Sequence, residues 1–211
     1  MAQPPFDLVA ASTHLARRDR TLARMIREIG PCRLEIAARQ SPYEALAESI
    51  VYQQLNGKAA ATIYARFCSA LGSRRCPRAE KVVAASPELL RSAGLSRSKA
   101  AALQDLAARV LAGEIPTRRA AESLADDALI ERLTAVRGVG RWTVEMFLIF
   151  TLGRPDILPL DDYGVRKGFA RVFARDVLPK PKELERQGDR WRPYRTAASW
   201  YLWRAADLEL T

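Results

Sequence analysis

Two short segments of this 211-residue sequence combine residue types that suit anion binding and acid chemistry. The first is Leu133-Thr-Ala-Val-Arg-Gly-Val-Gly-Arg-Trp-Thr143, and the second is Leu158-Pro-Leu-Asp-Asp-Tyr163. Gly138 and Gly140 bracket one apolar residue between two helical patterns. Because glycine lets the backbone turn tightly, this turn can present bare N–H groups to an anion at the start of the next helix. We therefore expect a phosphate site there.

The adjacent acids Asp161 and Asp162 stand directly before another helical pattern. Acidic residues at helix starts ordinarily cap free N–H groups and complement the helix dipole, and we expect one of the two to do so. The other then lies beside a helix N-terminus that favours its ionised form. Such a carboxylate suits cleavage of a glycosidic bond, because it can stabilise an oxocarbenium-like sugar or activate the attacking water.

Taken alone, the glycine turn also fits a simple corner between two helices. Its context favours the anion site, because Arg137 and Arg141 flank the glycines and the whole chain is basic. Lys and Arg number 34 against 24 Asp and Glu, a formal net charge of +10. A folded surface of this charge favours a polyanionic partner, and nucleic acid fits best.

The elements around these segments are expected to be helices throughout. Ala and Leu dominate and apolar residues recur at helical spacing, which predicts an all-α fold. The expected helices are 5–18, 19–29, 42–55, 58–71, 79–84, 87–92, 98–111, 126–135, 141–152, 162–174, 181–187 and 193–206.

The expected helices group into two lobes. A Gly/Pro-rich stretch from Gly153 to Pro159 indicates a crossing between them. We predict one lobe from residues 42–152, carrying the helical hairpin, and a second from residues 1–41 plus 153–211, carrying the acids. A DNA- and base-binding cleft is expected between the lobes.

Little in the sequence indicates a metal, a cofactor or a membrane. Cys32, Cys68 and Cys76 are too few and too widely spaced for a thiolate metal site, and His14 is the single histidine. We expect buried or incidental thiols and no cofactor. The N-terminus has no signal-peptide pattern and no apolar run could span a bilayer, which predicts a cytoplasmic protein associated with the nucleoid.

The two opening segments together resemble the helix-hairpin-helix, Gly/Pro-rich loop and aspartate of the HhH-GPD DNA glycosylase superfamily. More closely, the chain resembles the compact all-helical form of the 3-methyladenine DNA glycosylase II family. Three further segments are similar to that family: Ser49-Ile-Val-Tyr-Gln-Gln-Leu-Asn-Gly-Lys-Ala-Ala60, Gly94-Leu-Ser-Arg-Ser-Lys99 and Trp191-Arg-Pro-Tyr-Arg195. The resemblance covers roughly residues 42–205, and its separated motifs agree.

This resemblance implies a role for each matching residue. The catalytic aspartate falls on Asp162, and Asp161 becomes the helix cap or a supporting partner. Phosphate binding through backbone amides falls on Gly138, Gly140 and Thr143, with Arg137 and Arg141 beside them. Some family members hold a monovalent cation on hairpin carbonyls, and the matching carbonyls belong to Thr134, Val136 and Val139.

Trp142 distinguishes between the reactions of the superfamily. Relatives that also cut the DNA strand carry a lysine there, because a Schiff base needs an amine, and an indole cannot attack a sugar carbon. Relatives with an iron–sulfur cluster carry four cysteines near the C-terminus, whereas no cysteine here follows Cys76. The resemblance therefore implies hydrolysis without strand cleavage.

The same resemblance implies a base pocket and a wedge. Trp142 and Trp203 match base-stacking residues, and Tyr163 lies next to the acid; stacking contributes about 1–3 kcal/mol per base. Met146 and Arg204 depart from the family, each replacing an aromatic residue, so base selectivity can differ. Gln54 or Leu55 is the expected wedge that fills the gap left by a flipped nucleotide, whereas Gln53 also fits a plain helix end. Trp191, Trp200 and Tyr201 fit a packed core better than a site.

We therefore predict a monomeric, monofunctional DNA glycosylase that flips alkylated purines, of the 3-methyladenine and 7-methylguanine type, out of duplex DNA and leaves an abasic site. Two alternatives stay open from the sequence. One is a glycosylase for deaminated or oxidised purines, and the other is a non-catalytic protein that binds damaged DNA through its hairpin. The presence of Asp162 argues against the second.

Overall fold

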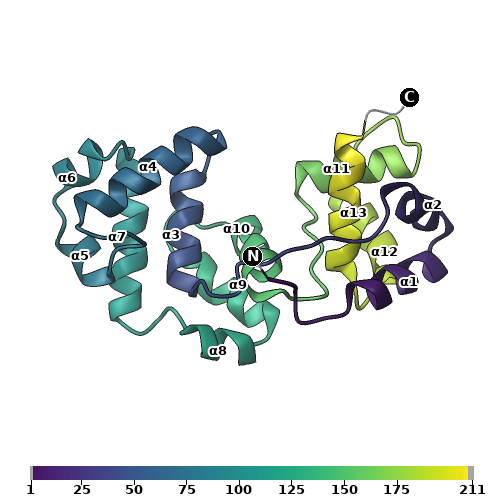
Figure 1. Ribbon diagram of the computed structural model, residues 1–211, viewed down its shortest axis with the longest axis horizontal. Coiled ribbons are helices and arrows are strands. Elements are labelled where there is room, and N and C mark those ends of the chain that lie inside the picture. The colour runs from purple at the N-terminus through teal and green to yellow at the C-terminus, as the bar shows by residue number, and fades with distance from the viewer. Residues whose placement is uncertain (1, 209–211) are drawn as a thin grey trace. The chain divides into compact units, whose positions relative to one another are not determined.

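The computed structural model describes residues 2–208, and its regular structure there is helical apart from one isolated antiparallel bridge between Ala2 and Ile36. The predicted all-α fold is confirmed. The chain divides into two compact units, one of residues 39–147 and one of residues 1–38 with 148–211, and each is described here by itself (Figure 1). None of the described helices is long and apolar enough to cross a membrane.

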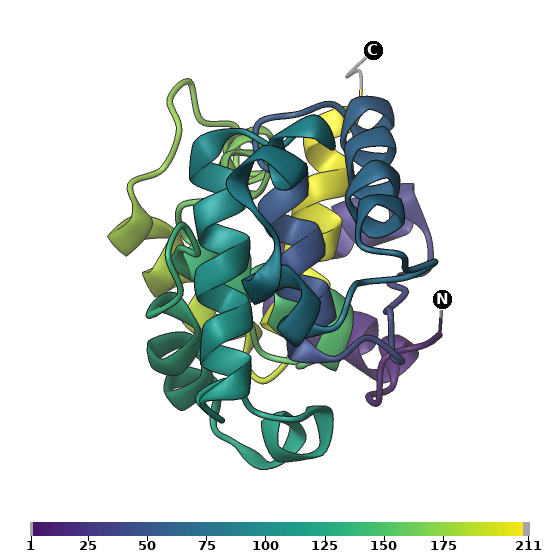
Figure 2. The same cartoon turned by 90° about the vertical axis from the view of Figure 1, so that its left-hand side faces the viewer.

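The unit of residues 39–147, called the hairpin unit below, is built around one long helix. Its helices are α3 (Pro42–Tyr52), α4 (Gly57–Ala70), α5 (Ala79–Ala84), α6 (Pro87–Ser92), α7 (Arg97–Leu111), α8 (Arg118–Ser123), α9 (Asp126–Thr134) and α10 (Arg141–Phe147). Helix α7 packs against α3, α5 and α6, and α10 packs on α3 and α9 (Figure 2). Leu103 and Leu106 of α7 are fully buried in this core. Burial of such side chains is the main favourable term that holds the unit together.

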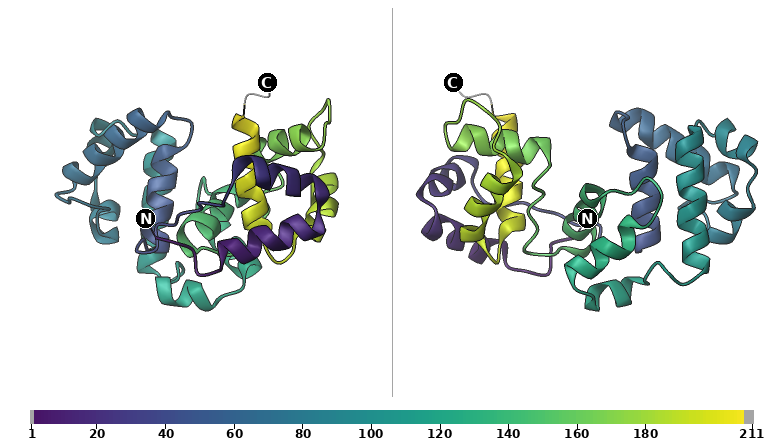
Figure 3. Two further views of the ribbon diagram at one scale, coloured as in Figure 1. Left: turned by 45° about the vertical axis from the view of Figure 1, so that its right-hand side comes forward. Right: turned by 180° about the vertical axis from the view of Figure 1, so that it is seen from behind.

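The other unit, called the acid unit below, is built around its last helix. It contains α1 (Leu8–Arg18), α2 (Arg20–Ile29), five residues of π-helix (Leu148–Leu152), α11 (Tyr163–Val172), α12 (Pro181–Gly188), a 3₁₀ turn (Asp189–Trp191) and α13 (Arg195–Asp207). Helix α13 packs against α11, α2 and α1 (Figure 3). Trp191 and Tyr201 are fully buried, as expected for core aromatics, and Trp200 is half-buried.

Side-chain caps explain where most of these helices begin. Ser41 and Glu44 form a capping box at α3, and Asn56, Ser86, Ser96 and Thr117 accept hydrogen bonds from the first turns of α4, α6, α7 and α8. Helix α8 was not predicted, because its segment Arg118-Arg-Ala-Ala-Glu-Ser123 has only alanines as apolar residues and so shows no clear apolar face. Helix α3 ends at Tyr52 rather than Leu55, because Gln54 has φ of 57° and leaves the helical region.

The predicted lobe boundaries differ from the observed units at residues 39–41 and, more importantly, at residues 148–152. We assigned this stretch to the hairpin lobe as the end of one helix, but it belongs to the acid unit. The backbone widens there into a π-helix, and the Phe150 carbonyl accepts a hydrogen bond from the Ala37 N–H at 2.7 Å. Such π-helical turns are rare and occur often at functional sites.

Candidate active site

Asp162 is the N-cap of α11, so the cap role, one of the two alternatives expected for Asp161, belongs to Asp162. The Asp162 Oδ1 accepts the Val165 N–H at 2.7 Å, and Asp161 is exposed. A carboxylate at this position is stabilised by the helix dipole and by the amide it accepts. The residue expected to do the chemistry is therefore also the residue that starts the helix.

A second donor fixes the orientation of this carboxylate. The Trp203 indole N–H, from α13, donates to the same Asp162 Oδ1 at 2.8 Å. The Trp203 ring stacks on Phe150, with ring centres 5.6 Å apart and planes 29° apart. Trp203 was expected to stack on a base, and the structure shows it holding the acid. A hydrogen bond to an ionised acceptor is stronger than one between neutral groups, so this contact restricts the carboxylate markedly.

Glycines let α11 approach α13 closely enough for this contact. A Cβ on Gly168 would lie 1.8 Å from the Leu202 carbonyl oxygen, and one on Gly164 would lie 2.8 Å from Trp203 Cδ1. Distances this short are impossible for real atoms, so both positions need glycine at the observed spacing. The close packing of α11 on α13 brings Asp162 within reach of Trp203.

The Gly/Pro-rich segment that leads to the acid is bound to the start of α13. Arg195 forms an ion pair with Asp156 at 2.8 Å, and the Thr196 hydroxyl donates to the Arg154 carbonyl and accepts the Ile157 N–H. The Ser199 hydroxyl donates to the Ile157 carbonyl at 3.2 Å. These bonds satisfy backbone groups that an irregular segment cannot satisfy by itself. The segment that leads to Asp162 is thus held against α13.

The predicted hairpin is present between α9 and α10. Gly138 has φ of 74°, in the region that glycine adopts without strain, and Gly140 is exposed. The first helical bond of α10 runs from Val144 N to Gly140 O at 3.3 Å, so the helix begins directly at the glycine turn. This is the geometry with which a helix start binds an anion.

Neighbouring side chains hold the hairpin loop in place. The Arg137 N–H donates to Asp105 Oδ2 of α7 at 2.8 Å, and the Gln53 side chain donates to the Gly138 carbonyl at 2.9 Å. The exposed Arg141 pairs with the buried Glu145 at 3.0 Å, so part of its charge is balanced within the protein. The Arg137 side chain is exposed.

The segment between α3 and α4 carries both wedge candidates at the surface. Gln54 is exposed with a positive φ, and Leu55 is 39% exposed. Gln53 points elsewhere, because its amide binds the hairpin. An exposed apolar side chain on a tight turn is a suitable element for insertion between bases.

The four residues expected to line a base pocket are divided between the units. Trp142 and Met146 lie four positions apart on α10, on one face of that helix, and Trp142 is 47% exposed. Tyr163, 66% exposed, starts α11, and Trp203 lies on α13. Arg204, beside Trp203, lies over the Trp200 ring at 5.6 Å. Each unit therefore contributes one exposed aromatic side chain beside its candidate functional segment.

The three cysteines carry buried or half-buried thiols. Burial raises the pKa of Cys32 to about 11 and the pKa of Cys76 to about 12, so both stay protonated at neutral pH. Within residues 2–208, His, Cys, Asp and Glu form no cluster of three that could hold a metal ion. In the hairpin, the Val136 carbonyl, one of the three expected cation ligands, also accepts the Val139 N–H at 3.1 Å.

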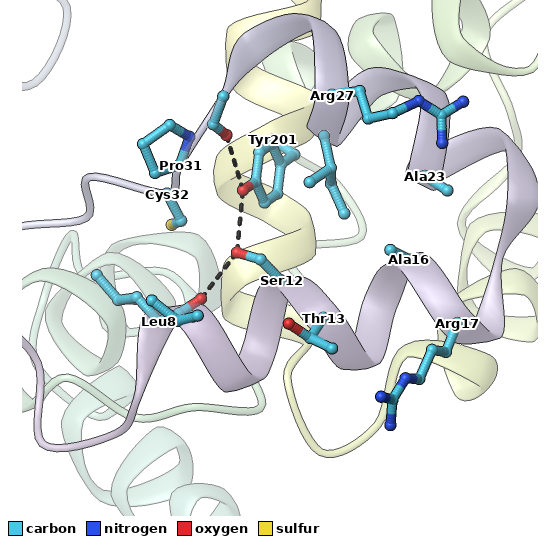
Figure 4. Close-up of a pocket in the computed structure, with 13 residues that line it drawn as sticks. Leu8, Ser12, Thr13, Ala16, Arg17, Ala23, Arg27, Pro31, Cys32 and Tyr201 are labelled. Atoms are coloured by element: carbon cyan, nitrogen blue, oxygen red, sulfur yellow. Dashed lines mark hydrogen bonds between the residues drawn. The ribbon is translucent and has the colours of Figure 1, made fainter.

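A cavity of about 610 Å³ lies between α1 and α2, away from these segments in sequence. Ser12 and Tyr201 are among the residues that line it (Figure 4); their hydroxyls lie 3.0 Å apart, and the Tyr201 hydroxyl lies 3.0 Å from the Gly30 carbonyl. These polar groups are bonded to one another and to the backbone. The cavity contains none of the predicted site residues.

Several residues that position the site stand out little in the sequence. Lys99 lies in a family-like segment without an assigned role, and Asp105 and Phe150 were not singled out. Lys99 does have one unusual feature in the sequence: it places a positive charge in the first turn of a helix, where the helix dipole disfavours it. A contact between Lys99 and another part of the protein offsets this cost.

Comparisons with known proteins identify the family of this chain. Residues 47–193 match the family profile of the HhH-GPD superfamily base excision DNA repair proteins. The chain is 37% identical to DNA-3-methyladenine glycosylase 1 of Schizosaccharomyces pombe, over 95% of this chain and 89% of that protein. It is 32% identical to the alkylbase DNA glycosidase-like protein of the same organism, over 96% of this chain and 95% of that protein.

Solved structures show the same relationship. The structure of the S. pombe 3-methyladenine DNA glycosylase in complex with abasic DNA matches with a TM-score of 0.82 at 37% identity, covering 94% of this chain and 97% of that one. A DNA-3-methyladenine glycosidase from Bacillus halodurans matches with a TM-score of 0.83 at 35% identity, covering 93% and 88%. The chain belongs to the HhH-GPD superfamily of base excision DNA repair proteins.

Proposed function

We propose that this protein is a monofunctional DNA glycosylase that takes alkylated purines, such as 3-methyladenine and 7-methylguanine, out of duplex DNA and hydrolyses the N-glycosidic bond. The observation that carries the proposal is the Asp162 carboxylate, held at the start of α11 by the Trp203 indole. Relatives named as 3-methyladenine DNA glycosylases over nearly the whole chain support the substrate class.

The chemistry required of the protein is modest for such substrates. An alkylated purine that carries positive charge is a good leaving group, so its bond to the sugar breaks with charge developing on C1′ of the deoxyribose. A fixed carboxylate stabilises that oxocarbenium-like state and can accept a proton from the attacking water. Asp162 has this role in our proposal, and the Trp203 N–H keeps the carboxylate oriented throughout.

Trp142 supports hydrolysis rather than strand cleavage. The position holds an indole, which has no nucleophilic amine to form a Schiff base with the sugar. We therefore expect an intact strand with an abasic site as the product. The exposed Trp142 ring is instead suited to stacking on a base, and a cationic base increases that attraction.

Binding to DNA is assigned to the hairpin and the turn at residues 53–56. The N–H groups at the start of α10 bind a phosphate, and Gln54 or Leu55 fills the gap left by the extruded nucleotide. The carbonyls of Thr134, Val136 and Val139 are the groups that would hold a monovalent cation beside that phosphate, where it would add positive charge. We expect the protein to act as a monomer on nucleoid DNA.

The decisive experiment compares two neighbouring carboxylates on methylated duplex DNA. Asp162→Asn should reduce single-turnover base release at least about 100-fold, the usual loss when a general acid–base group is removed. Asp161→Asn is the matched control, because it removes the same charge from an exposed residue that does not cap α11. Asn can still cap the helix, so Asp162→Asn should fold and bind abasic-analogue DNA.

Substrate choice and product identity complete the test. Duplexes with 3-methyladenine, hypoxanthine or 8-oxoguanine should be processed with a clear preference for the methylated base. Strand breaks formed by the purified wild type without heat or alkali would contradict hydrolysis. Full base release by a folded Asp162→Asn variant would overturn the catalytic assignment, and tight binding without turnover on every lesion would favour a damage-binding protein.

A further inference from the structure

The turn between α3 and α4, residues 53–56 and called the wedge turn here, has a backbone that needs external support. Gln54 has φ of 57°, a conformation that residues other than glycine adopt at a cost. Within the turn, the Leu55 N–H reaches the Tyr52 carbonyl only at 3.3 Å. A segment with strained backbone and weak local bonds keeps its shape only when its surroundings hold it.

Lys99 provides that support from the first turn of α7. Its Nζ donates to the Val51 carbonyl and to the Gln53 carbonyl, both at 2.7 Å. These carbonyls belong to the end of α3, where helix geometry leaves carbonyl groups without an intrahelical partner. Two short, charge-assisted bonds to adjacent points fix where the helix ends and the wedge turn begins. Burial also lowers the pKa of the Lys99 ammonium, as expected for a cation withdrawn from water.

The same face of α7 holds the hairpin loop. Asp105 accepts the Arg137 N–H at 2.8 Å, and the Ala102 side chain lies beneath Gly138, 3.6 Å from where a Cβ would be. Lys99, Ala102 and Asp105 follow one another at intervals of three, which places them along one side of the helix. The Gln53 amide closes the arrangement by donating to the Gly138 carbonyl.

We propose that Lys99 is a positioning residue that binds the wedge turn to α7 and, through Gln53, to the hairpin. The wedge turn and the phosphate-binding hairpin then keep a constant spacing on DNA. The inference rests on the proposed function. A turn that is already ordered loses little entropy when it enters the duplex, whereas a loose turn must be ordered at the moment the nucleotide leaves the stack. Loss of Lys99 should therefore slow nucleotide extrusion and leave binding of undamaged DNA nearly unchanged.

The test uses Lys99→Met with Lys81→Met as its matched control. Lys81 of α5 makes an equivalent contact at the end of α4, where its Nζ donates to the Leu71 carbonyl at 2.9 Å. Single-turnover base release is measured on one methylated base in a correct pair and in a mispair. Because mispaired bases cost less to extrude, Lys99→Met should be slowed about 10-fold on the paired lesion and much less on the mispaired one. Lys81→Met should show no such asymmetry.

A second variant keeps the test decisive if Lys99→Met folds poorly. Gln53→Ala removes only the link to the hairpin and should show the same asymmetry, and the double variant should lose less than the product of the two single losses, because both act on one turn. Fluorescence of 2-aminopurine beside the lesion reports extrusion directly. Equal losses on both substrates, or independent effects of the two variants, would overturn the positioning role. A wild type that releases no methylated base would instead refute the proposed function.

Discussion

Helix α13 in the acid unit and helix α7 in the hairpin unit do similar work by different means. Each holds an irregular functional segment along one side by contacts from its side chains. On α13 the contacts are made by Arg195, Thr196, Ser199 and Trp203, and on α7 by Lys99, Ala102 and Asp105. Both segments contain backbone N–H and C=O groups that need hydrogen-bond partners from outside the segment, and a rigid neighbouring helix, the template below, supplies them.

The two templates differ in burial. Thr196 and Ser199 of α13 are fully buried, whereas the Asp105 side chain of α7 is 32% exposed and Lys99 is half-buried. Neutral hydroxyls can be buried at little cost once they are hydrogen-bonded, whereas charged groups remain near water. A carboxylate that must stabilise a transition state needs a fixed position, and a hairpin that must meet DNA needs access. The difference in burial follows from these two requirements.

The largest expected effect comes from breaking the α11–α13 contact. Gly168→Ala places a methyl group 1.8 Å from the Leu202 carbonyl oxygen, and a backbone atom in a buried helix cannot move aside cheaply. The free energy of unfolding should fall by about 3 kcal/mol or more, at the upper end of overpacking effects. Urea unfolding measures this loss. Gly57→Ala, with nothing within 4 Å of the added methyl group, is the control and should change stability little.

Next in size is the loss of the indole donor. Trp203→Phe keeps an aromatic ring against Phe150 and removes the bond to Asp162 Oδ1. Base release should slow about 10- to 100-fold, because a hydrogen bond to a charged group contributes about 1.5–3 kcal/mol. Single-turnover kinetics on methylated duplex DNA measure the loss. If the rate of base release at saturating protein stays unchanged and only the protein concentration needed to reach half of it rises, Trp203 acts in base binding rather than in orienting the acid.

A smaller effect is expected on the α7 side of the comparison. Asp105→Ala removes the acceptor of the Arg137 N–H and should weaken binding of undamaged duplex DNA about 3- to 10-fold, the range for one lost hydrogen bond. Fluorescence anisotropy at fixed salt measures the affinity. The Asp105 carboxylate also pairs with Arg109, at 3.1 Å. Glu114→Ala is the matched control, because Glu114 pairs with the same Arg109, at 2.6 Å, and makes no contact with the hairpin loop in the bonds described above. Equal losses in both variants would attribute the effect to the lost pairing with Arg109 rather than to the hairpin.

The smallest expected effect lies on the Tyr201 side of α13. Tyr201→Phe removes the hydroxyl that contacts Ser12 and the Gly30 carbonyl, and should cost about 1 kcal/mol of stability with base release unchanged. Thermal unfolding measures the change in stability, and the methylated-duplex assay measures base release. Loss of activity in this variant would show that both sides of α13 serve the site.

The same variant has a defined pH dependence. Burial raises the pKa of Tyr201 above its usual value, so the unfolded chain releases this proton near pH 10 while the native protein keeps it. The stabilisation that the protonated Tyr201 contributes to the native state is therefore fully present below about pH 10 and is lost as the pH rises further. Between pH 7 and 10.5, the stability difference between the wild type and Tyr201→Phe should narrow by up to about 1 kcal/mol. A constant difference would contradict the assigned burial effect.

Much of the local structure could be read from particular residues. Ser41, Asn56 and Ser96 begin helices, because a side-chain oxygen next to the first turn satisfies amides that the helix leaves open. The glycine hairpin and the Asp161-Asp162 pair at a helix start could be predicted as well, because both depend on residues that are close together in the chain. The end of α3 was misplaced, because Gln53 and Gln54 leave the helical region there, and Lys99, 46 positions from Gln53, holds their backbone in place.

By itself, the sequence determined an all-helical fold, a hairpin suited to phosphate, and an acid at a helix start, because periodicity, capping and turn chemistry act over a few residues. Only the tertiary structure decided that Trp203 orients Asp162 and that Lys99 and Asp105 hold the wedge turn and hairpin. Those choices depend on close packing and hydrogen bonds between residues far apart in the chain, which no local pattern records.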